Sequence, residues 1–224
     1  MAAAFDRLAN EYDRWFDSDE GRPTFEMEIA CLRDLMGEDG IGWLEVGVGT
    51  GRFAQPLGVQ DGIDPSAAML EFAARRGIRT RQGRGEALPY QDASFNGVLL
   101  ALTLCFVEDP RLVLRECARV LSDPGHLVIG FIPSDSPWGR YYQRKGRKGN
   151  PFYSEAEFFT CDQVKHMALS AGFDLERAAS CLLSPPDEPL DTSQREGIVT
   201  GAGFVAMRFV RTRPRLAGRE EARA

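Results

Sequence analysis

The stretch Glu45-Val46-Gly47-Val48-Gly49-Thr50-Gly51-Arg52-Phe53 decides how the rest of the chain is interpreted. It overlaps the end of an apolar run that begins at Ile41, and it contains three glycines at alternate positions. Glycine can adopt positive φ and lets a ligand lie against bare backbone. The free N–H groups and positive dipole end of a helix after such a turn favour anionic groups. The stretch therefore predicts a strand, a ligand-binding turn and a helix.

The spacing of the glycines indicates the kind of ligand. A dinucleotide fingerprint has the pattern G-x-G-x-x-G, and its third glycine would fall at the bulky Arg52. The carboxylate of Glu45 would repel a pyrophosphate and attract an ammonium group. The pattern thus favours a cofactor with an ammonium group and no phosphate. Glycine-rich turns are also common without any ligand, so the flanking motifs have to decide between a site and a plain turn.

Composition and charge narrow the class of protein. The 224 residues are enough for one domain with a proper core, and 43% hydrophobic and 27% charged residues are typical of a soluble globular protein. A net charge of −6 argues against sequence-independent nucleic-acid binding, because such binding needs a basic surface. No apolar run approaches the roughly 20 residues of a membrane helix, and the first residues become charged too early for a signal peptide.

The cysteines and histidines indicate neither a metal site nor a disulfide framework. Five scattered cysteines and two histidines have no metal-ligand spacing. An odd number of isolated thiols fits a reducing compartment. We therefore expect a cytoplasmic protein with no bound metal and no stable membrane insertion.

Apolar patterns along the chain alternate between strand-like and helix-like. Two amphipathic helices are predicted first, one carrying Phe5 to Phe16 and one opened by Pro23 and ending at Met36. The strands are then expected at Gly42–Val46, Val59–Ile63, Ile78–Arg81, Phe95–Leu102, His126–Ile132, Phe173–Ser180 and Gly203–Val210. Helices are expected at Ser66–Arg76, Pro110–Leu121 and Thr160–Ala171, a turn at Ser122–Gly125 and a loop at Ser184–Glu196. Such alternation predicts βαβ units on a parallel sheet.

Four further stretches carry a resemblance to a known family. They are Phe5-Asp6-x-x-Ala9-x-x-Tyr12-Asp13, Gly62-Ile63-Asp64-Pro65-Ser66-Ala67-Ala68-Met69-Leu70, Gly83 to Asn96, and Ala101 to Phe106. With the glycine stretch, they make the chain similar to class I S-adenosylmethionine (SAM) methyltransferases of the ubiquinone/menaquinone-biosynthesis (methyltransferase domain 11-like) type, from Phe5 to about Val210. The resemblance implies a Rossmann-like, doubly wound, seven-stranded and mostly parallel sheet with helices on both faces.

The same resemblance implies the domain organisation. Residues 1–212 are expected to form a single SAM-binding domain. Within it, 1–36 would form lid helices and 133–159 would be an insertion that caps the substrate. The charged residues 213–224 are expected to be a disordered tail.

The resemblance also implies how the cofactor is held. SAM, with S-adenosylhomocysteine (SAH) as product, is expected to contact Tyr12, Glu45, Gly47, Gly49, Gly51, Asp64, Pro65, Met69, Gly85, Glu86 and Ala101. Asp64 would accept both ribose hydroxyls, and Tyr12 would close over the cofactor. Two positions depart from the family pattern, since Arg84 and Asn96 stand where aspartate is usual. Arginine cannot accept a hydrogen bond from the adenine amino group, so adenine would depend on backbone at Gly85 and Glu86.

The acceptor is expected to be a small molecule. Cys105, Trp138, Tyr141 and Tyr153 are candidates for its pocket, which suits an aromatic or lipophilic compound. The basic cluster Arg140, Arg144, Lys145, Arg147 and Lys148 would either steer an anionic acceptor or remain a solvated loop. His166, Glu108, Asp135 and Tyr153 are possible general bases, and the sequence does not choose among them. No catalytic residue is therefore assigned.

Three functions remain open on the sequence alone. The main prediction is a SAM-dependent methyltransferase for a small molecule. A protein that keeps the cofactor site as a sensor or binding partner is one alternative, since no base is evident. A nicotinamide-dependent oxidoreductase is the other, and Arg52 in place of the third glycine argues against it. Oligomeric state is not encoded in any pattern that we find.

Overall fold

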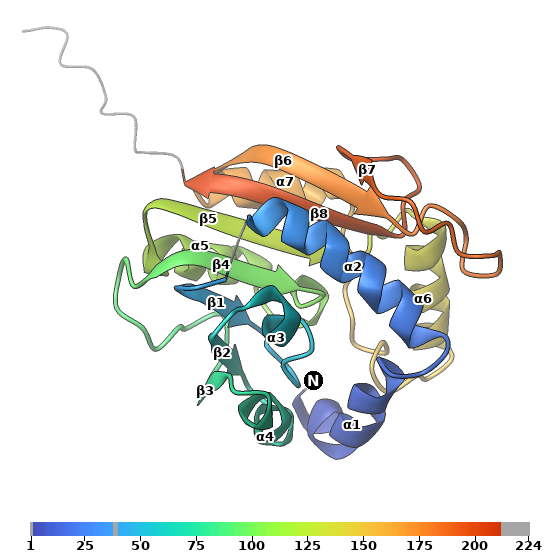
Figure 1. Cartoon of the computed structure of the whole chain (residues 1–224), viewed down its shortest axis with the longest axis horizontal. Coiled ribbons are helices and arrows are strands. Elements are labelled where there is room, and N and C mark those ends of the chain that lie inside the picture. The colour runs from blue at the N-terminus through green and yellow to red at the C-terminus, as the bar shows by residue number, and fades with distance from the viewer. Residues whose placement is uncertain (1, 38–39, 212–224) are drawn as a thin grey trace, which may run out of the picture.

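An eight-stranded sheet runs through the middle of the computed structural model, which describes residues 2–37 and 40–211 (Figure 1). The strands are β1 Trp43–Val46, β2 Asp61–Asp64, β3 Arg79–Gln82, β4 Phe95–Ala101, β5 Leu121–Phe131, β6 Phe173–Cys181, β7 Arg195–Glu196 and β8 Phe204–Arg211. The helices are α1 Ala2–Trp15, α2 Gly21–Met36, α3 Ala54–Leu57, α4 Ala67–Arg75, α5 Pro110–Val120, α6 Pro137–Arg147 and α7 Cys161–Ser170, with a 3₁₀ turn η1 at Leu104–Phe106.

The strand order is β3-β2-β1-β4-β5-β8-β6-β7. The five strands from β3 to β5 in this order are parallel to one another, whereas β8 is antiparallel to both β5 and β6. The order reverses at β1, which lies between β2 and β4. In open α/β sheets, ligands bind where the order reverses, at the carboxyl ends of the strands. The topology therefore places a site beyond the ends of β1, β2 and β4.

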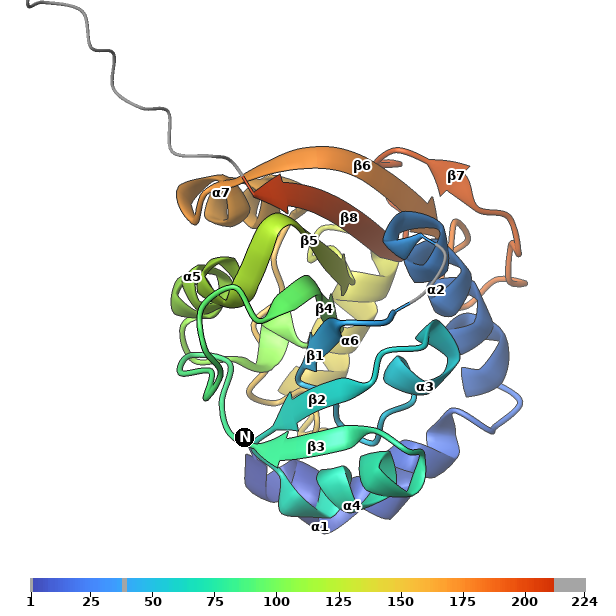
Figure 2. The same ribbon diagram turned by 60° about the vertical axis from the view of Figure 1, so that its left-hand side comes forward.

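Helices cover both faces of the sheet (Figure 2). Alternate residues of each strand point to opposite faces. Trp43, Leu99, Val128 and Ala206 join the core on the face of α2 and α3. Leu44, Leu100, Ile129 and Val205 join the core on the face of α5 and α7. The doubly wound α/β prediction is confirmed.

The helix starts follow local capping chemistry. The Ser66, Asp109, Ser136 and Thr160 side chains each accept a backbone N–H in the first turn of α4, α5, α6 and α7. These contacts satisfy one of the N–H groups that every helix leaves unpaired at its start.

Several expected elements need correction. The expected count of seven strands is wrong, because the two residues of β7 add an eighth strand at the edge, in the segment expected as a loop. Helix α6 was not expected, α2 begins at Gly21 rather than at Pro23, and the helix after the glycines is only the four residues of α3. The turn expected at Ser122–Gly125 lies inside β5, at a register shift against β4. The tail predicted at 213–224 lies outside the described residues.

Candidate active site

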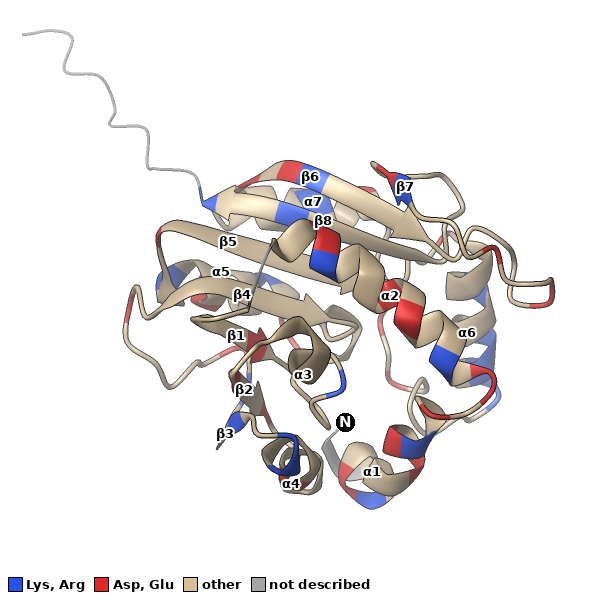
Figure 3. Ribbon diagram, in the orientation of Figure 1, with Lys and Arg blue, Asp and Glu red and all other residues tan. Residues whose placement is uncertain are grey.

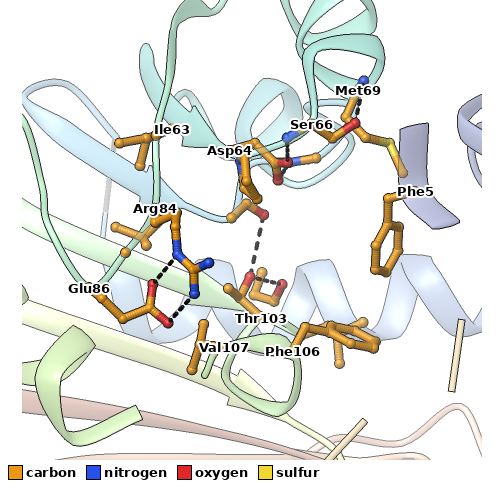
Figure 4. Close-up of a pocket in the computed structure, with 18 of the residues that line it drawn as sticks. Phe5, Ile63, Asp64, Ser66, Met69, Arg84, Glu86, Thr103, Phe106 and Val107 are labelled. Atoms are coloured by element: carbon orange, nitrogen blue, oxygen red, sulfur yellow. Dashed lines mark hydrogen bonds and ion pairs between the residues drawn. The ribbon is translucent and has the colours of Figure 1, made fainter. Parts of the chain in front are cut away.

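A cavity of about 360 Å³ opens beyond the carboxyl ends of β1, β2 and β4. We call it the cofactor cavity. It is lined by Phe5, Tyr12, Val46, Gly47, Gly49, Ile63, Asp64, Pro65, Ser66, Met69, Gly83, Arg84, Gly85, Glu86, Ala101, Leu102, Thr103, Phe106, Val107 and Glu108. Figure 4 shows Asp64 and Ser66 near the start of α4, with Thr103 and Phe106 across the cavity and Arg84 beside Glu86.

Asp64, the last residue of β2, presents a carboxylate to the cofactor cavity. Its Oδ2 accepts the N–H of Gly49 at 3.0 Å, and its Oδ1 accepts the N–H of Ser66 at 2.9 Å. Burial raises the pKa of Asp64 to about 6, although the two backbone N–H groups favour the ionised form. Each oxygen still has capacity to accept a further hydrogen bond. The residue is therefore a fixed acceptor suited to a pair of hydroxyl groups.

Glu45 lies in β1 below the glycine turn and is only 1% exposed. Burial raises the pKa of Glu45 well above its ordinary value, and the nearby Asp64 raises it further, while the Ala54 N–H opposes both. Among the described residues, its Oε2 is one of the few buried oxygens with no hydrogen-bond partner. An unpaired buried carboxyl costs free energy unless a ligand group pairs with it. An ammonium group would supply that pairing.

All three glycines have positive φ, and a Cβ at Gly47 would clash with the Thr103 Cγ2. Gly49 has φ +51°, and a Cβ there would meet only the Tyr12 ring, at 4.0 Å, so its open side faces the cavity. Gly51 has φ +79°, and a Cβ there would lie 3.1 Å from the Ala73 Cα of α4. Gly51 therefore allows the turn to approach α4, and it does not line the cavity.

Arg52 fastens α1 across the glycine turn. Its Nη2 donates to Asp13 Oδ2 at 2.9 Å and to Asp17 Oδ2 at 2.6 Å. Arg76, which follows α4, donates to Asp13 Oδ2 at 3.0 Å and to the Thr50 carbonyl at 2.8 Å. Near the start of α1, Asp6 accepts the Ser66 hydroxyl at 2.5 Å. Arg52, which stands where a dinucleotide fingerprint would have its third glycine, thus holds α1 over the cofactor cavity.

Arg84 takes part in ion pairs at the rim of the cavity. Its Nη2 lies 2.8 Å from Glu108 Oε2, and its Nε lies 3.4 Å from Glu86 Oε2. Glu86 also accepts the Glu108 N–H at 2.8 Å. The loop after β3 is therefore joined to the segment before α5 by the arginine that stands in place of the family aspartate.

A second cavity, of about 620 Å³, adjoins the first. We call it the aromatic cavity. It is lined by Phe5, Glu11, Tyr12, Trp15, Phe16, Asp19, Glu20, Pro23, Thr24, Glu28, Leu102, Leu104, Cys105, Phe106, Phe131, Ile132, Trp138, Tyr141, Tyr142, Lys145, Asn150, Phe152, Tyr153, Phe158, Phe159, Pro186, Glu188 and Leu190. Phe5, Tyr12, Leu102 and Phe106 line both cavities. Leu102 has φ +54°, a strained conformation of the kind that occurs at functional sites.

Most of the residues expected in the site line these two cavities. Nine of the eleven expected cofactor residues line the cofactor cavity; Glu45 is buried behind its lining and Gly51 packs on α4. Cys105, Trp138, Tyr141 and Tyr153 all line the aromatic cavity. Trp138 is also a core residue, with Nε1 donating to the Ser184 carbonyl at 2.8 Å. Figure 3 shows the basic residues along α6 in blue. Of the basic cluster on and just after α6, only Lys145 lines the aromatic cavity.

The structure separates the possible bases. His166 and Asp135 are exposed and line neither cavity, and Glu108 is paired with Arg84 at the rim of the cofactor cavity. Burial raises the pKa of Cys105 to about 12, so its thiol is neutral near pH 7. Glu28 of α2 was missed by the sequence analysis and lines the aromatic cavity. The sequence feature that could have identified Glu28 is its position as an acidic residue, next to Ile29, on an otherwise apolar helix face.

Comparisons with known proteins agree with this geometry. A family model described as a methyltransferase domain matches residues 44–129. An uncharacterised protein of Mycobacterium tuberculosis is 42% identical over 211 residues, which cover 93% of this chain and 74% of that protein. A demethylmenaquinone methyltransferase of Thermotoga maritima is 30% identical over 206 residues, which cover 76% of this chain and 86% of that enzyme.

A solved structure gives the same result. The crystal structure of a SAM-dependent methyltransferase from Thermotoga maritima, described as a possible histamine N-methyltransferase, superposes with a TM-score of 0.87. It is 34% identical, and the match covers 95% of this chain and 100% of that chain. The chain belongs to the class I SAM-dependent methyltransferases. Its cofactor is SAM, and neither the sensor nor the oxidoreductase alternative is favoured.

The cofactor cavity suits SAM chemically. Its volume lies in the range of about 300–1,000 Å³ that is usual for small-molecule sites. Asp64 offers acceptors for hydroxyls, and the unpaired Glu45 offers a carboxyl for an ammonium group. Within residues 2–37 and 40–211, none of the helices combines the length and apolar composition needed to cross a bilayer.

Proposed function

We propose that the chain transfers the methyl group of SAM to a small organic molecule in the aromatic cavity. The supporting observation is the wall that the two cavities share, formed by Phe5, Tyr12, Leu102 and Phe106. Ligands bound in the two cavities would meet beside these four residues, at the end of β4. Methyl transfer requires this kind of arrangement, because acceptor and methyl group must be aligned and kept from water.

Individual residues have proposed roles toward the cofactor. Asp64 accepts the ribose hydroxyls, and Glu45 attracts the ammonium group. Gly47 and Gly49 let the methionine part of SAM lie against backbone. Tyr12 closes the cavity from α1. When bound, SAM supplies an electrophilic methyl group on a sulfonium sulfur.

The acceptor is proposed to have an aromatic or lipophilic body. Trp138, Tyr141, Tyr142, Phe152 and Tyr153 give the aromatic cavity a wall of rings that such a body would contact. The named relatives include a demethylmenaquinone methyltransferase and a possible histamine N-methyltransferase, so a ring system and an amine are both represented among them.

Thermal unfolding with SAM, SAH or NAD tests the proposal, after any bound ligand has been stripped. A ligand at about 100 times its dissociation constant adds about 2.7 kcal/mol of stability. For a domain of this size, that corresponds to a rise in Tm of about 5–10 °C. We expect this rise with SAM and SAH and none with NAD. The absence of a rise with SAM, or a rise with NAD alone, would contradict the proposed cofactor site.

Transfer itself is tested by an acceptor screen with radiolabelled SAM. Label should pass to a small molecule that enters the aromatic cavity. A protein that binds SAM and transfers no label to any compound of a broad aromatic and amine library would fit a sensor rather than an enzyme.

A further inference from the structure

Glu28 is the buried acid of the aromatic cavity. It lies on α2, is 2% exposed and lines the cavity wall. Its Oε2 has no hydrogen-bond partner within residues 2–37 and 40–211. No ion pair that involves Glu28 occurs in this part of the chain either. A buried carboxyl without a partner is costly, which points to a ligand group that completes it.

We propose that Glu28 binds the ammonium group of a small amine, which is the methyl acceptor, and takes up its proton. This inference rests on the proposed function, because it names the substrate class of that site. Three separate observations support it: the unpaired carboxyl, the aromatic walls and the charge of the lining.

Within the described part of the chain, burial and Cys31 are the main influences on the ionisation of Glu28, and no positively charged group is among them. Burial, together with the neighbouring Cys31, raises the pKa of Glu28 to about 8. Glu28 in turn contributes to the raised pKa values of Tyr12, Tyr142 and Tyr153, so these rings lie near it. An ammonium group brought against the Glu28 carboxyl would favour the ionised carboxylate, because opposite charges stabilise each other strongly where water is excluded.

The aromatic wall already carries one ammonium group of the chain. The Nζ of Lys145 lies 4.5 Å from the centroid of the Tyr141 ring and 5.9 Å from that of Tyr142. Cations are attracted to the faces of such rings. Tyr142 and Tyr153 contact each other at 4.7 Å between centroids, which extends the ring surface within the cavity. The wall is therefore chemically suited to an organic cation.

The charged groups that line the cavity are mostly acidic. Four further carboxylates, Glu11, Asp19, Glu20 and Glu188, line it, against the one amine of Lys145. A cavity with this balance attracts a cation and repels an anion. The basic residues of α6 other than Lys145 do not line it, so they do not change the balance.

The proton balance of the step is simple. An acceptor R–NH₃⁺ displaces the carboxyl proton of Glu28 to solvent and pairs with the carboxylate. One N–H bond then breaks, its proton goes to the Glu28 carboxylate and its electron pair stays on nitrogen. This lone pair is the nucleophile toward the methyl carbon. The methylated amine leaves as an ammonium ion, and Glu28 is again protonated, so one proton is released overall.

Calorimetric binding to the SAH-loaded protein tests the proposal without relying on turnover. The probes are 2-phenylethylamine, 4-phenylbutylamine and tyramine, each matched with the alcohol that has a hydroxyl in place of the amine. The variants are Glu28→Gln, which keeps the shape of the side chain, and Glu26→Gln. Glu26 lies on the same helix and is exposed, so the second variant makes the same substitution on the solvent side.

We expect at least one amine to bind the wild-type protein about tenfold or more tightly than its alcohol, as the loss of a charged hydrogen bond implies. Glu28→Gln should remove that preference and Glu26→Gln should keep it. The proposal is overturned if no amine exceeds its alcohol, or if a folded Glu28→Gln protein keeps the preference. If Glu28→Gln fails to fold, Glu28→Met takes its place, and a folded Glu28→Met protein that keeps the preference overturns the proposal equally. Loss of SAH binding by the wild-type protein would instead contradict the proposed function.

Discussion

Two carboxyl groups control the electrostatics of the cofactor cavity at the scale of single residues. Asp64 stands at the end of β2 with two backbone N–H groups on its oxygens, and Glu45 lies behind it with an unpaired oxygen. They lie close enough for Asp64 to raise the pKa of Glu45. Without a ligand, the pKa values of both carboxyl groups are therefore higher than those of ordinary carboxyl groups.

The raised pKa of Asp64 predicts a pH dependence of SAM binding. Burial brings this pKa to about 6, so the carboxyl is ionised above that pH and protonated below it. Ribose hydroxyls donate to the ionised form, so SAM binding should be tightest above pH 6 and should weaken by up to about tenfold per pH unit below it. Dissociation constants measured calorimetrically from pH 5 to pH 8 check this. Asp64→Asn should bind SAM weakly, with the acidic decline absent.

Gly49 offers a second test at the same scale. A valine there would take strained positive φ and place its branches on the side that faces the cavity and Tyr12. We expect Gly49→Val to weaken SAM binding by more than about tenfold, which is more than 1.4 kcal/mol. Gly77→Val is the matched control, because Gly77 has φ +83° with nothing within 4 Å. Both variants should lose similar stability, and equal SAM affinity in the two would place the ligand away from Gly49.

The sequence predicts some residues of the site better than others. Asp64 could be predicted because it ends an apolar run at a fixed distance from the glycines. Glu28 could not, because whether one acid of an apolar helix faces a cavity or solvent depends on how α2 packs on the sheet. Arg84 could be recognised as a departure from the family pattern, whereas its pairing with Glu108 depends on two loops that meet only in the folded chain.

At the scale of elements, α1 is the part of the chain most dependent on a few polar contacts. It covers the cofactor cavity with Phe5 and Tyr12, and Asp13 receives both Arg52 and Arg76. Burial alone would raise the pKa of Asp13, but hydrogen bonds from the two arginines hold it below its ordinary value. A carboxyl with a lowered pKa stabilises the fold above its unfolded pKa. This attachment of α1 should therefore weaken only as the pH falls below about 4.

Arg52→Ala should loosen α1. We expect a loss of about 1–3 kcal/mol in the free energy of unfolding, because the variant removes charged hydrogen bonds from the largely buried Asp13. Hydrogen exchange should quicken in α1 before other helices, and SAM affinity should fall severalfold. Arg75→Ala is the control, since its pair with Glu71 is fully on the surface and is worth little. If α1 exchanged equally in the two variants, Arg52 would not be its anchor.

Helix α6 shows where the pattern of apolar residues misleads. Its sequence contains four basic residues, two glycines and no aliphatic side chain, so no aliphatic periodicity indicates a helix. The usable signal was local: Ser136 caps the helix, Pro137 opens it, and the rings of Trp138 and Tyr142 recur at helical spacing. The strands were easier to predict because aliphatic runs bounded by turn residues mark them individually. Strand β7 has two exposed residues and no such run.

At the scale of the whole molecule, two cavities meet at one wall. The cofactor cavity lies at the carboxyl ends of the parallel strands, while the aromatic cavity is formed by α1, α2, α6 and the segments after β4, β5 and β6. Tyr12 lies between them. Burial raises its pKa, and carboxylates on both sides, Glu45 and Asp64 on one and Glu28 on the other, raise it further.

This arrangement predicts three separable patterns of damage. Asp64→Asn should weaken the binding of SAM and should not change the binding of an amine in the aromatic cavity. Trp138→Phe should weaken only the binding of the acceptor, because Trp138 lines the aromatic cavity and not the cofactor cavity. Phenylalanine also keeps most of the packing that Trp138→Ala would lose. Tyr12→Ala should weaken both ligands and reduce the rate further than either binding loss explains, because the shared wall would admit water. Titration of SAH and 2-phenylethylamine separately and together, with single-turnover rates, measures all three. A Tyr12→Ala protein with normal affinity for both ligands and a normal rate would mean that the two cavities are not joined through α1.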